Sequence, residues 1–234
     1  MNIAVILAGG IGSRMGDIDK PKQYLDVYGK PLIVYTLEAF NKNCNVDYIA
    51  VVCKEQWKED IHNWIREYKL NKVRWIFEGG ETRQESSYHA LKSLKEYCSD
   101  DDIVLIHDAA RPLVSQRIIS ENIELAKKYY AVNTVIPAND TIIRSLDNFT
   151  TYNVPVRSEM FLVQTPQSFR YSVILDAINK AAADNFTNST DDCQLVFRLG
   201  KPVHLVQGDK LNFKITTIED IALLKAYIKM EEHK

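Results

Sequence analysis

The chain has 234 residues, of which 46% are hydrophobic and 26% charged, and its formal net charge is −2. A chain of this length can bury a sizeable core without disulfides or metals, and its charge excludes the overall basic character of nucleic-acid-binding proteins. The four cysteines form no CxxC pair, so we expect free thiols in a reducing compartment. No apolar run reaches the ~20 residues of a transmembrane helix, and the N-terminal run 3–8 is too short for a signal peptide. We therefore expect a cytoplasmic protein.

The first two-thirds of the chain alternates short apolar runs with segments of helical spacing. The runs 3–7, 48–53, 73–77, 103–106 and 132–136 are rich in β-branched residues and predict strands buried on both faces, as in parallel sheets. Helices are expected to start after Pro31 and to cover about 55–68 and 84–97. This alternation predicts an α/β fold with a doubly wound, mostly parallel, Rossmann-like sheet.

The alternation stops after Pro137. Residues 139–164 predict two extended pieces around the turn Asp147-Asn148, a β-hairpin arm projecting from the sheet. Helices at about 171–183 and 191–199, a strand at 203–206 and a C-terminal helix from about Ile218 follow. We expect a single domain over 1–234, with an arm that pairs subunits because an isolated hairpin is only marginally stable in water.

A glycine-rich segment, AGGIGSRMG at 8–16, directly follows the first predicted strand. Glycine there lets backbone N–H groups approach an anion closely. A tight structural turn is one alternative. A dinucleotide fingerprint needs G-x-G-x-x-G and an acidic residue after the second strand, and a Walker A loop needs Gly-Lys-Ser/Thr; neither is present. Arg14 and Lys22 add two cations next to the glycines, which favours a nucleotidyltransferase loop that binds a triphosphate.

Further segments make this interpretation specific. They are PKQYL (21–25), EGGETRQES (78–86), HDAARP (107–112), QTPQSF (164–169), STDD (189–192) and NFKITTIED (212–220). With the glycine loop, and in this order, they resemble 2-C-methyl-D-erythritol 4-phosphate cytidylyltransferases and the sister family of ribitol-5-phosphate cytidylyltransferases. The similarity covers essentially the whole chain.

The resemblance implies a CTP site. By it, Ala8, Gly9, Gly10 and Gly12 wrap the nucleotide, while Gly80, Glu81, Arg83 and Ser86 contact the cytosine and ribose. Arg14 and Lys22 neutralise the phosphates, and Lys214 reaches the α-phosphate. Taken alone, Gly79-Gly80 could be an ordinary turn before a helix, and Lys214 a surface lysine.

Asp108 stands at the carboxyl end of a predicted strand, so it is the expected ligand of Mg²⁺, which takes one or two carboxylates plus phosphate oxygens. The alternative is that Asp108 caps the following turn. By the resemblance, Arg111, Thr141, Arg157 and Thr165 join Asp108 in binding the acceptor. Thr141 and Arg157 lie in the arm, which the resemblance implies reaches into the neighbouring site of a homodimer.

The acceptor is less determined than the donor. The methylerythritol family commonly has Asp-Thr-Ile-Lys at positions 140–143, where this chain has Ile143 as the fourth residue. Ile143 and Phe197 favour a pentitol phosphate as the acceptor. Methylerythritol phosphate is favoured by HDAARP, EGGETRQES and the Gly16–Lys22 spacing. We expect transfer of CMP from CTP to 2-C-methyl-D-erythritol 4-phosphate for isoprenoid precursor synthesis. The alternative is ribitol 5-phosphate, giving CDP-ribitol for cell-wall or capsule polymers. A catalytically silent paralogue and a dinucleotide-binding oxidoreductase remain as alternatives of other classes.

Overall fold

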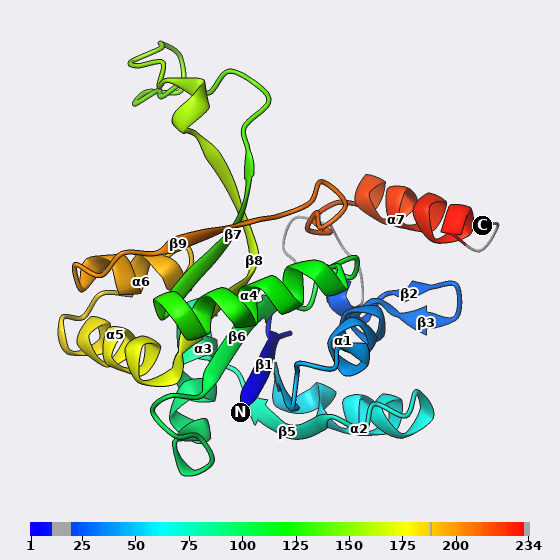
Figure 1. Ribbon diagram of the computed structural model, residues 1–234. Helices are drawn as coiled ribbons and strands as arrows, with labels where there is room; N and C mark the ends of the chain where they lie inside the picture. The colour runs from blue at the N-terminus through cyan, green and yellow to red at the C-terminus, as the bar shows by residue number, and fades with distance from the viewer. Residues whose placement is uncertain (11–19, 188, 232–234) are drawn as a thin grey trace.

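One seven-stranded sheet forms the centre of the computed structural model, which describes residues 1–10, 20–187 and 189–231 (Figure 1). Side by side, its strands are β5 (Val73–Glu78), β4 (Tyr48–Cys53), β1 (Asn2–Leu7), β6 (Ile103–Asp108), β8 (Phe161–Arg170), β7 (Ala131–Pro137) and β9 (His204–Gln207). A short ribbon of β2 (Asp26–Val27) and β3 (Lys30–Pro31) lies outside it. Antiparallel pairing in the large sheet involves only β8, with β6 and β7. The predicted mostly parallel α/β fold is therefore confirmed.

Helices cover both faces of this sheet. They are α1 (Leu32–Lys42), α2 (Lys58–Glu67), α3 (Arg83–Ser93), α4 (Gln116–Tyr129), α5 (Tyr171–Ala183), α6 (Asp192–Arg198) and α7 (Ile218–Glu231). Alternate residues of each central strand point to opposite faces. Ala4 and Ile6 therefore pack with α1 and α4, whereas Ile3 and Val5 pack with α3 and α5. None of the described helices is both long enough and apolar enough to cross a membrane. All four cysteines are free, as predicted, and the cytoplasmic location stays a prediction.

Strand β8 and helix α4 are elements that the sequence pattern did not lead us to predict. The strand lies in the middle of the sheet, but its inner residues include Gln164, Gln167 and Ser168, all nearly inaccessible to solvent. Such a polar run does not have the apolar pattern of a buried strand. In α4, Ile118, Ile119 and Ile123 do have helical spacing and face the core, so the pattern for this helix was present in the sequence.

The arm projects from the sheet between the end of β7 and the beginning of β8 (Figure 1). Ladder pairing ends at Pro137 and Phe161, and beyond it there is one isolated bridge, between Arg144 and Asn153. The expected turn is present, because the Asp147 carboxylate accepts hydrogen bonds from the N–H groups of Phe149 and Thr150 at 2.9 and 2.8 Å. The arm is thus a largely irregular loop on a short hairpin base.

A polar network fixes α4 to the antiparallel part of the sheet. The fully buried Asn122 donates to Thr134 Oγ1 (2.8 Å) and accepts from Ser168 Oγ (2.9 Å), and Thr134 donates to the Pro166 carbonyl (2.6 Å). A buried polar group that loses its partner keeps its full desolvation cost. The side-chain amide of Asn122 therefore stabilises three elements at once.

We expect Asn122→Ala to lower the free energy of unfolding by about 2–4 kcal/mol, because Thr134 and Ser168 lose their buried partner. Urea denaturation followed by circular dichroism measures this. The control is Glu121→Ala, which removes an exposed ion pair with Arg117 and should cost less than about 1 kcal/mol. Equal losses in the two variants would contradict the role of the network.

Candidate active site

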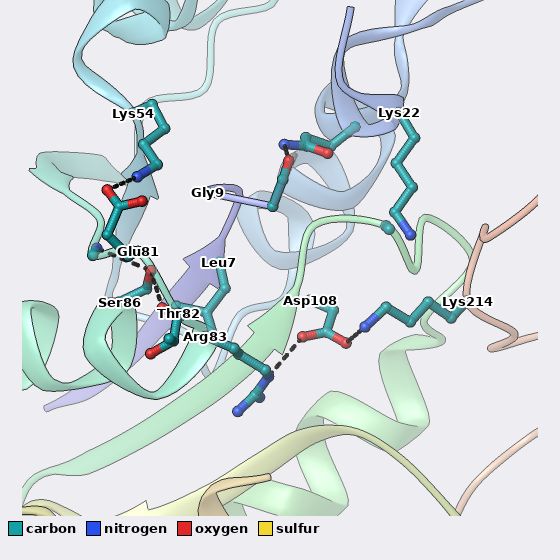
Figure 2. Close-up of a pocket in the computed structure, with 14 residues that line it drawn as sticks. Leu7, Gly9, Lys22, Lys54, Glu81, Thr82, Arg83, Ser86, Asp108 and Lys214 are labelled. Carbon is teal, nitrogen blue, oxygen red and sulfur yellow. Dashed lines mark hydrogen bonds and ion pairs between the residues drawn. The ribbon is translucent and has the colours of Figure 1, made fainter. Parts of the chain in front are cut away.

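A cleft of about 290 Å³ opens at the carboxyl ends of β1, β4, β5 and β6 (Figure 2). In an open α/β sheet this edge is where ligands bind. The residues around the cleft come from segments far apart in the sequence, and they are Leu7, Gly9, Gly10, Lys22, Gln23, Lys54, Gly80, Glu81, Thr82, Arg83, Ser86, Asp108, Ala110 and Lys214. Most of the predicted donor-site residues thus lie together.

The start of the glycine loop is held by side chains of the following segment. Gln23 donates from Nε2 to the carbonyls of Ala8 (2.6 Å) and Gly10 (2.8 Å), and the Tyr24 hydroxyl also donates to Ala8 (2.9 Å). Both side chains are buried, so the loop leaves β1 in a fixed direction. Gly12 and Arg14 lie outside the described residues, and their predicted roles stay predictions.

The loop before α3 forms the opposite wall of the cleft. Thr82 caps α3 and Glu85 completes a capping box, which fixes the helix start. The Ser86 hydroxyl accepts from Gly80 N–H (3.1 Å) and donates to the Thr82 carbonyl (3.0 Å). A Cβ on Gly80 would lie 2.2 Å from Glu85 Cβ, so only glycine fits there. Gly80 is part of a close-packed wall rather than an ordinary turn.

Glu81 is placed differently from its neighbours. Its side chain is 89% exposed and forms an ion pair with Lys54, with Nζ to Oε1 at 2.8 Å. Lys54 follows β4, and in Figure 2 its side chain points to the Glu81 carboxylate. Both residues border the cleft, so the pair forms part of its wall.

Asp108 lies at the carboxyl end of β6 and joins the two halves of the site. Its carboxylate accepts from Arg83 Nε (3.3 Å) and Lys214 Nζ (2.7 Å), as the dashed lines in Figure 2 show. Burial alone raises the pKa of this carboxyl, but the charges of Arg83, Lys214 and Arg111 outweigh it and hold the pKa well below its ordinary value. Asp108 is therefore ionised at neutral pH and paired with two cations, and its predicted roles in binding Mg²⁺ and the acceptor stay predictions.

A second cavity adjoins the first. Its lining residues are Arg83, Asp108, Arg111, Val163, Gln164, Thr165, Gln167, Thr190, Asp191 and Lys214. Arg83, Asp108 and Lys214 border both cavities. A group that passes from a ligand in one cavity to a ligand in the other must cross at these three side chains.

A buried histidine organises the second cavity. The pKa of His107 is lowered to about 3, chiefly by complete burial, so the ring is neutral. Its two ring nitrogens lie 3.0 Å from Thr165 Oγ1 and 3.2 Å from the Arg111 carbonyl. Thr165 also accepts from Asp108 N–H at 3.1 Å. His107 is a packed strand residue that borders neither cavity, and it contacts Thr165 and the Arg111 carbonyl.

The arm residues are not brought to this site. Thr141 and Arg157 are exposed and border neither cavity of their own chain. Arg157 donates to the Asn139 carbonyl at 3.4 Å, within the arm. Their predicted roles in binding the acceptor, and the dimer that the sequence led us to expect, stay predictions.

The comparisons with known proteins agree with this geometry. The family described as IspD, 2-C-methyl-D-erythritol 4-phosphate cytidylyltransferase, matches residues 2–230. The chain belongs to this family. It is a CTP-dependent nucleotidyltransferase, as predicted, and the oxidoreductase alternative is excluded.

The similar curated proteins are full-length relatives. A ribitol-5-phosphate cytidylyltransferase of Vibrio parahaemolyticus is 39% identical, covering 100% of this chain and 98% of its own length. One of Lacticaseibacillus paracasei is 37% identical, covering 99% and 100%. Among solved structures, the 4-diphosphocytidyl-2C-methyl-D-erythritol synthase of Anaerococcus prevotii is 30% identical with a TM-score of 0.84, covering 97% of this chain and 96% of its own. The Francisella tularensis 2-C-methyl-D-erythritol 4-phosphate cytidylyltransferase is 30% identical with a TM-score of 0.81, covering 96% and 98%.

Among the residues at this site that were not predicted from the sequence, three carry charge or hold the loops in place. Lys54 and Gln23 border the cleft, and Asp192 lies behind it in contact with Arg83. Gln23 and Asp192 stand inside the segments PKQYL and STDD that carried the resemblance, so a signal for them was present. For Lys54 the only signal was its position at the end of a predicted strand.

We expect Gly80→Ala to weaken CTP binding by about tenfold or more, because the new Cβ displaces the wall that Ser86 and Glu85 hold. Gly79→Ala should have a smaller effect, since its Cβ would lie 3.0 Å from the Ser86 hydroxyl. Isothermal titration calorimetry with CTP measures both. An unchanged affinity in Gly80→Ala would contradict the assignment of this loop to the nucleotide.

Proposed function

We propose that this enzyme transfers CMP from CTP to ribitol 5-phosphate, releasing pyrophosphate and forming CDP-ribitol. The observation that carries the proposal is the pair of curated relatives with this activity, 39% and 37% identical over essentially their whole lengths. The solved methylerythritol phosphate enzymes described above are 30% identical. This reverses the order of the two acceptors expected from the sequence, and it removes isoprenoid synthesis as the favoured context.

Two side chains are consistent with that choice. Ile143, which stands where the methylerythritol family commonly has lysine, is 56% exposed on the arm, and Phe197 is 73% exposed on α6. Neither offers a cation to an acceptor phosphate or a hydrogen bond to a polyol. These positions therefore differ in chemistry from the methylerythritol pattern.

We place CTP in the first cavity and the acceptor in the second. Gly9, Gly10, Gly80 and Ser86 would then enclose the nucleoside, while Lys22 would face the leaving phosphates with Arg14. Lys214 would contact the α-phosphate, since it borders both cavities. Arg111 would hold the acceptor phosphate, and its buried Nε has no hydrogen-bond partner among the described residues.

The proposed chemistry needs positioning and charge neutralisation rather than a base. The acceptor phosphate is an anion near neutral pH, so it can attack the α-phosphorus of CTP once the repulsion between the phosphates is neutralised. Bond formation to the acceptor oxygen breaks the bond to the β-phosphate, and pyrophosphate leaves with both electrons. Arg83 and Lys214 lie where that charge moves.

Mg²⁺ is the cofactor that we propose for this reaction. Asp108 is the one carboxylate that borders both cavities, and the part of the chain described here holds no cluster of three or more metal-ligating side chains. This donor set fits an ion that takes a single carboxylate and completes its shell with phosphate oxygens and water. Bound there, Mg²⁺ would neutralise phosphate charge.

We also propose a homodimer formed through the arm. Large apolar side chains are exposed along it, among them Leu146 (67%), Phe149 (94%) and Tyr152 (65%). Large apolar side chains left exposed on one segment are typical of segments that contact another protein. Thr141 and Arg157 would then complete the acceptor cavity of the partner subunit.

Pyrophosphate release with CTP, Mg²⁺ and each of the two acceptors tests the substrate. We expect kcat/KM with ribitol 5-phosphate to exceed that with methylerythritol 4-phosphate by about tenfold or more, equivalent to ~1.4 kcal/mol of discrimination. A preference for methylerythritol 4-phosphate would restore the expectation from the sequence. Release with neither acceptor would overturn the assignment to either polyol phosphate.

Mixed dimers test the arm. We expect Arg157→Ala and Lys214→Ala to be nearly inactive separately. Unfolded together and refolded, they should recover about a quarter of wild-type activity, because half of the dimers are mixed and each mixed dimer has one site with both residues. Size-exclusion chromatography confirms that dimers form. No recovery in correctly formed dimers would place Arg157 in its own subunit's site or outside catalysis.

A further inference from the structure

Arg83 is held between two carboxylates that differ in their surroundings. Its Nη1 donates to Asp192 Oδ2 at 2.7 Å, and its Nε donates to Asp108 Oδ1 at 3.3 Å. The Asp192 side chain is 1% exposed, whereas that of Asp108 is 12% exposed and borders both cavities. The shorter contact is thus made to the buried carboxylate, which borders neither cavity.

Asp192 is itself fixed from the sheet. Its backbone N–H donates to Gln167 Oε1 at 2.9 Å, and Gln167 is completely buried in β8. The Gln167 amide donates in turn to Asn133 on β7 and to Asp191, both at 3.0 Å. The backbone of Asp192, at the start of α6, is therefore fixed by buried residues of the central sheet.

This arrangement determines where the rest of the Arg83 side chain points. The guanidinium group is planar, so fixing Nη1 and Nε also fixes the direction of Nη2. Nη2 is buried and has no hydrogen-bond partner among the described residues. Buried N–H donors are nearly always paired, and a phosphate oxygen is a strong acceptor for this one.

We propose that Asp192 is a positioning residue of the transfer reaction: it holds Arg83, which borders both cavities, so that the guanidinium group is presented to the phosphate at their junction. The inference rests on the proposed function, since it assumes that phosphate transfer occurs between these cavities. Phosphate oxygens compete with Asp108 for Nε of Arg83 and for Lys214. Asp192 lies outside this competition, so it keeps the guanidinium in place while Asp108 changes partners.

A purely structural role makes a different prediction. Removing one partner of a buried ion pair destabilises a protein whatever the other partner does in catalysis. If Asp192 only compensates the charge of Arg83, its loss lowers the melting temperature but leaves kcat/KM unchanged in the folded enzyme. If Asp192 positions Arg83, removal of Asp192 lowers kcat/KM in the folded enzyme, but only in proteins that still contain Arg83.

The test is a double-mutant cycle of Asp192→Asn and Arg83→Gln, assayed with CTP and whichever acceptor the wild type uses, at a temperature where each variant is folded. We expect each single variant to lower kcat/KM by about tenfold or more. The double variant should stay within about twofold of Arg83→Gln, because residues that act through one another are not additive. Additive losses, or wild-type kcat/KM in folded Asp192→Asn, would overturn the proposal.

Two further variants separate a loss of stability from a loss of positioning. Asp102 is a buried carboxylate that directly precedes β6, at the end of the strand opposite to Asp108, and it binds the N-terminal amine and Ser99 N–H. Asp102→Asn should lower the melting temperature without changing kcat/KM. If Asp192→Asn does not fold, Asp192→Glu takes its place, because it keeps the charge beside Arg83 but moves the carboxylate by one methylene. A tenfold or larger loss of kcat/KM in folded Asp192→Glu that disappears in the Arg83→Gln background supports the proposal, and wild-type kcat/KM in folded Asp192→Glu contradicts it.

The wild-type measurement separates this proposal from the proposed function. A wild-type enzyme that uses methylerythritol 4-phosphate overturns the acceptor assignment but leaves the cycle fully informative. If neither acceptor is used, the same four proteins are compared by calorimetric titration with CTP. In that titration, Asp192→Asn should bind CTP more weakly than the wild type, and the same substitution in the Arg83→Gln background should have no effect. Unchanged CTP affinity in Asp192→Asn overturns the positioning role.

Discussion

The buried charge of Asp108 is the constraint on which the site depends. A carboxylate at the inner end of a cleft is stable as an ion only when cations lie beside it. Those cations come from three separate segments: Arg83 from α3, Arg111 from the loop after β6, and Lys214 from the segment before α7. Their convergence brings the second half of the chain over the carboxyl end of the parallel sheet. The same cations are the groups that a triphosphate and a sugar phosphate need, so the interaction that stabilises this part of the fold also prepares it for ligands.

The parallel part of the sheet could be predicted from the sequence almost to the residue. Its inner strands are covered by helices on both faces, so β1, β4 and β6 are continuous apolar runs. Strand β8 could not be found in this way. Gln164, Gln167 and Ser168 are buried there because their partners, among them Asn122, Asn133 and Asn212, are supplied by other elements. A pattern of hydrophobicity contains no information about a polar partner that lies 30 or more residues away.

The site was predictable where motifs and strand ends coincide. Gly80, Ser86, Asp108 and Lys214 were found because each stands in a segment of recognisable order, and the structure places them in one cleft. Asp192 was not singled out, although its segment was, because its contact with Arg83 joins two residues 109 positions apart. Lys54 was overlooked because a single lysine after a strand is usually a solvated side chain. The order of the two acceptors expected from the sequence depended on two positions, Ile143 and Phe197, weighed against HDAARP, EGGETRQES and the Gly16–Lys22 spacing, and the curated relatives favour the other order.

Strand β8 connects the base of the arm directly to the second cavity. Its first residues, Phe161 to Val163, are exposed at the base of the arm, and two residues later Thr165 lines the second cavity. Any protein bound on the arm and any small molecule bound beside Thr165 therefore act on the same rigid strand. Thermodynamic linkage requires that two such events change each other's affinity by the same factor. One coupling free energy would then be measured in two ways. Subunit association would depend on the concentration of polyol phosphate, and substrate saturation would depend on the concentration of the protein.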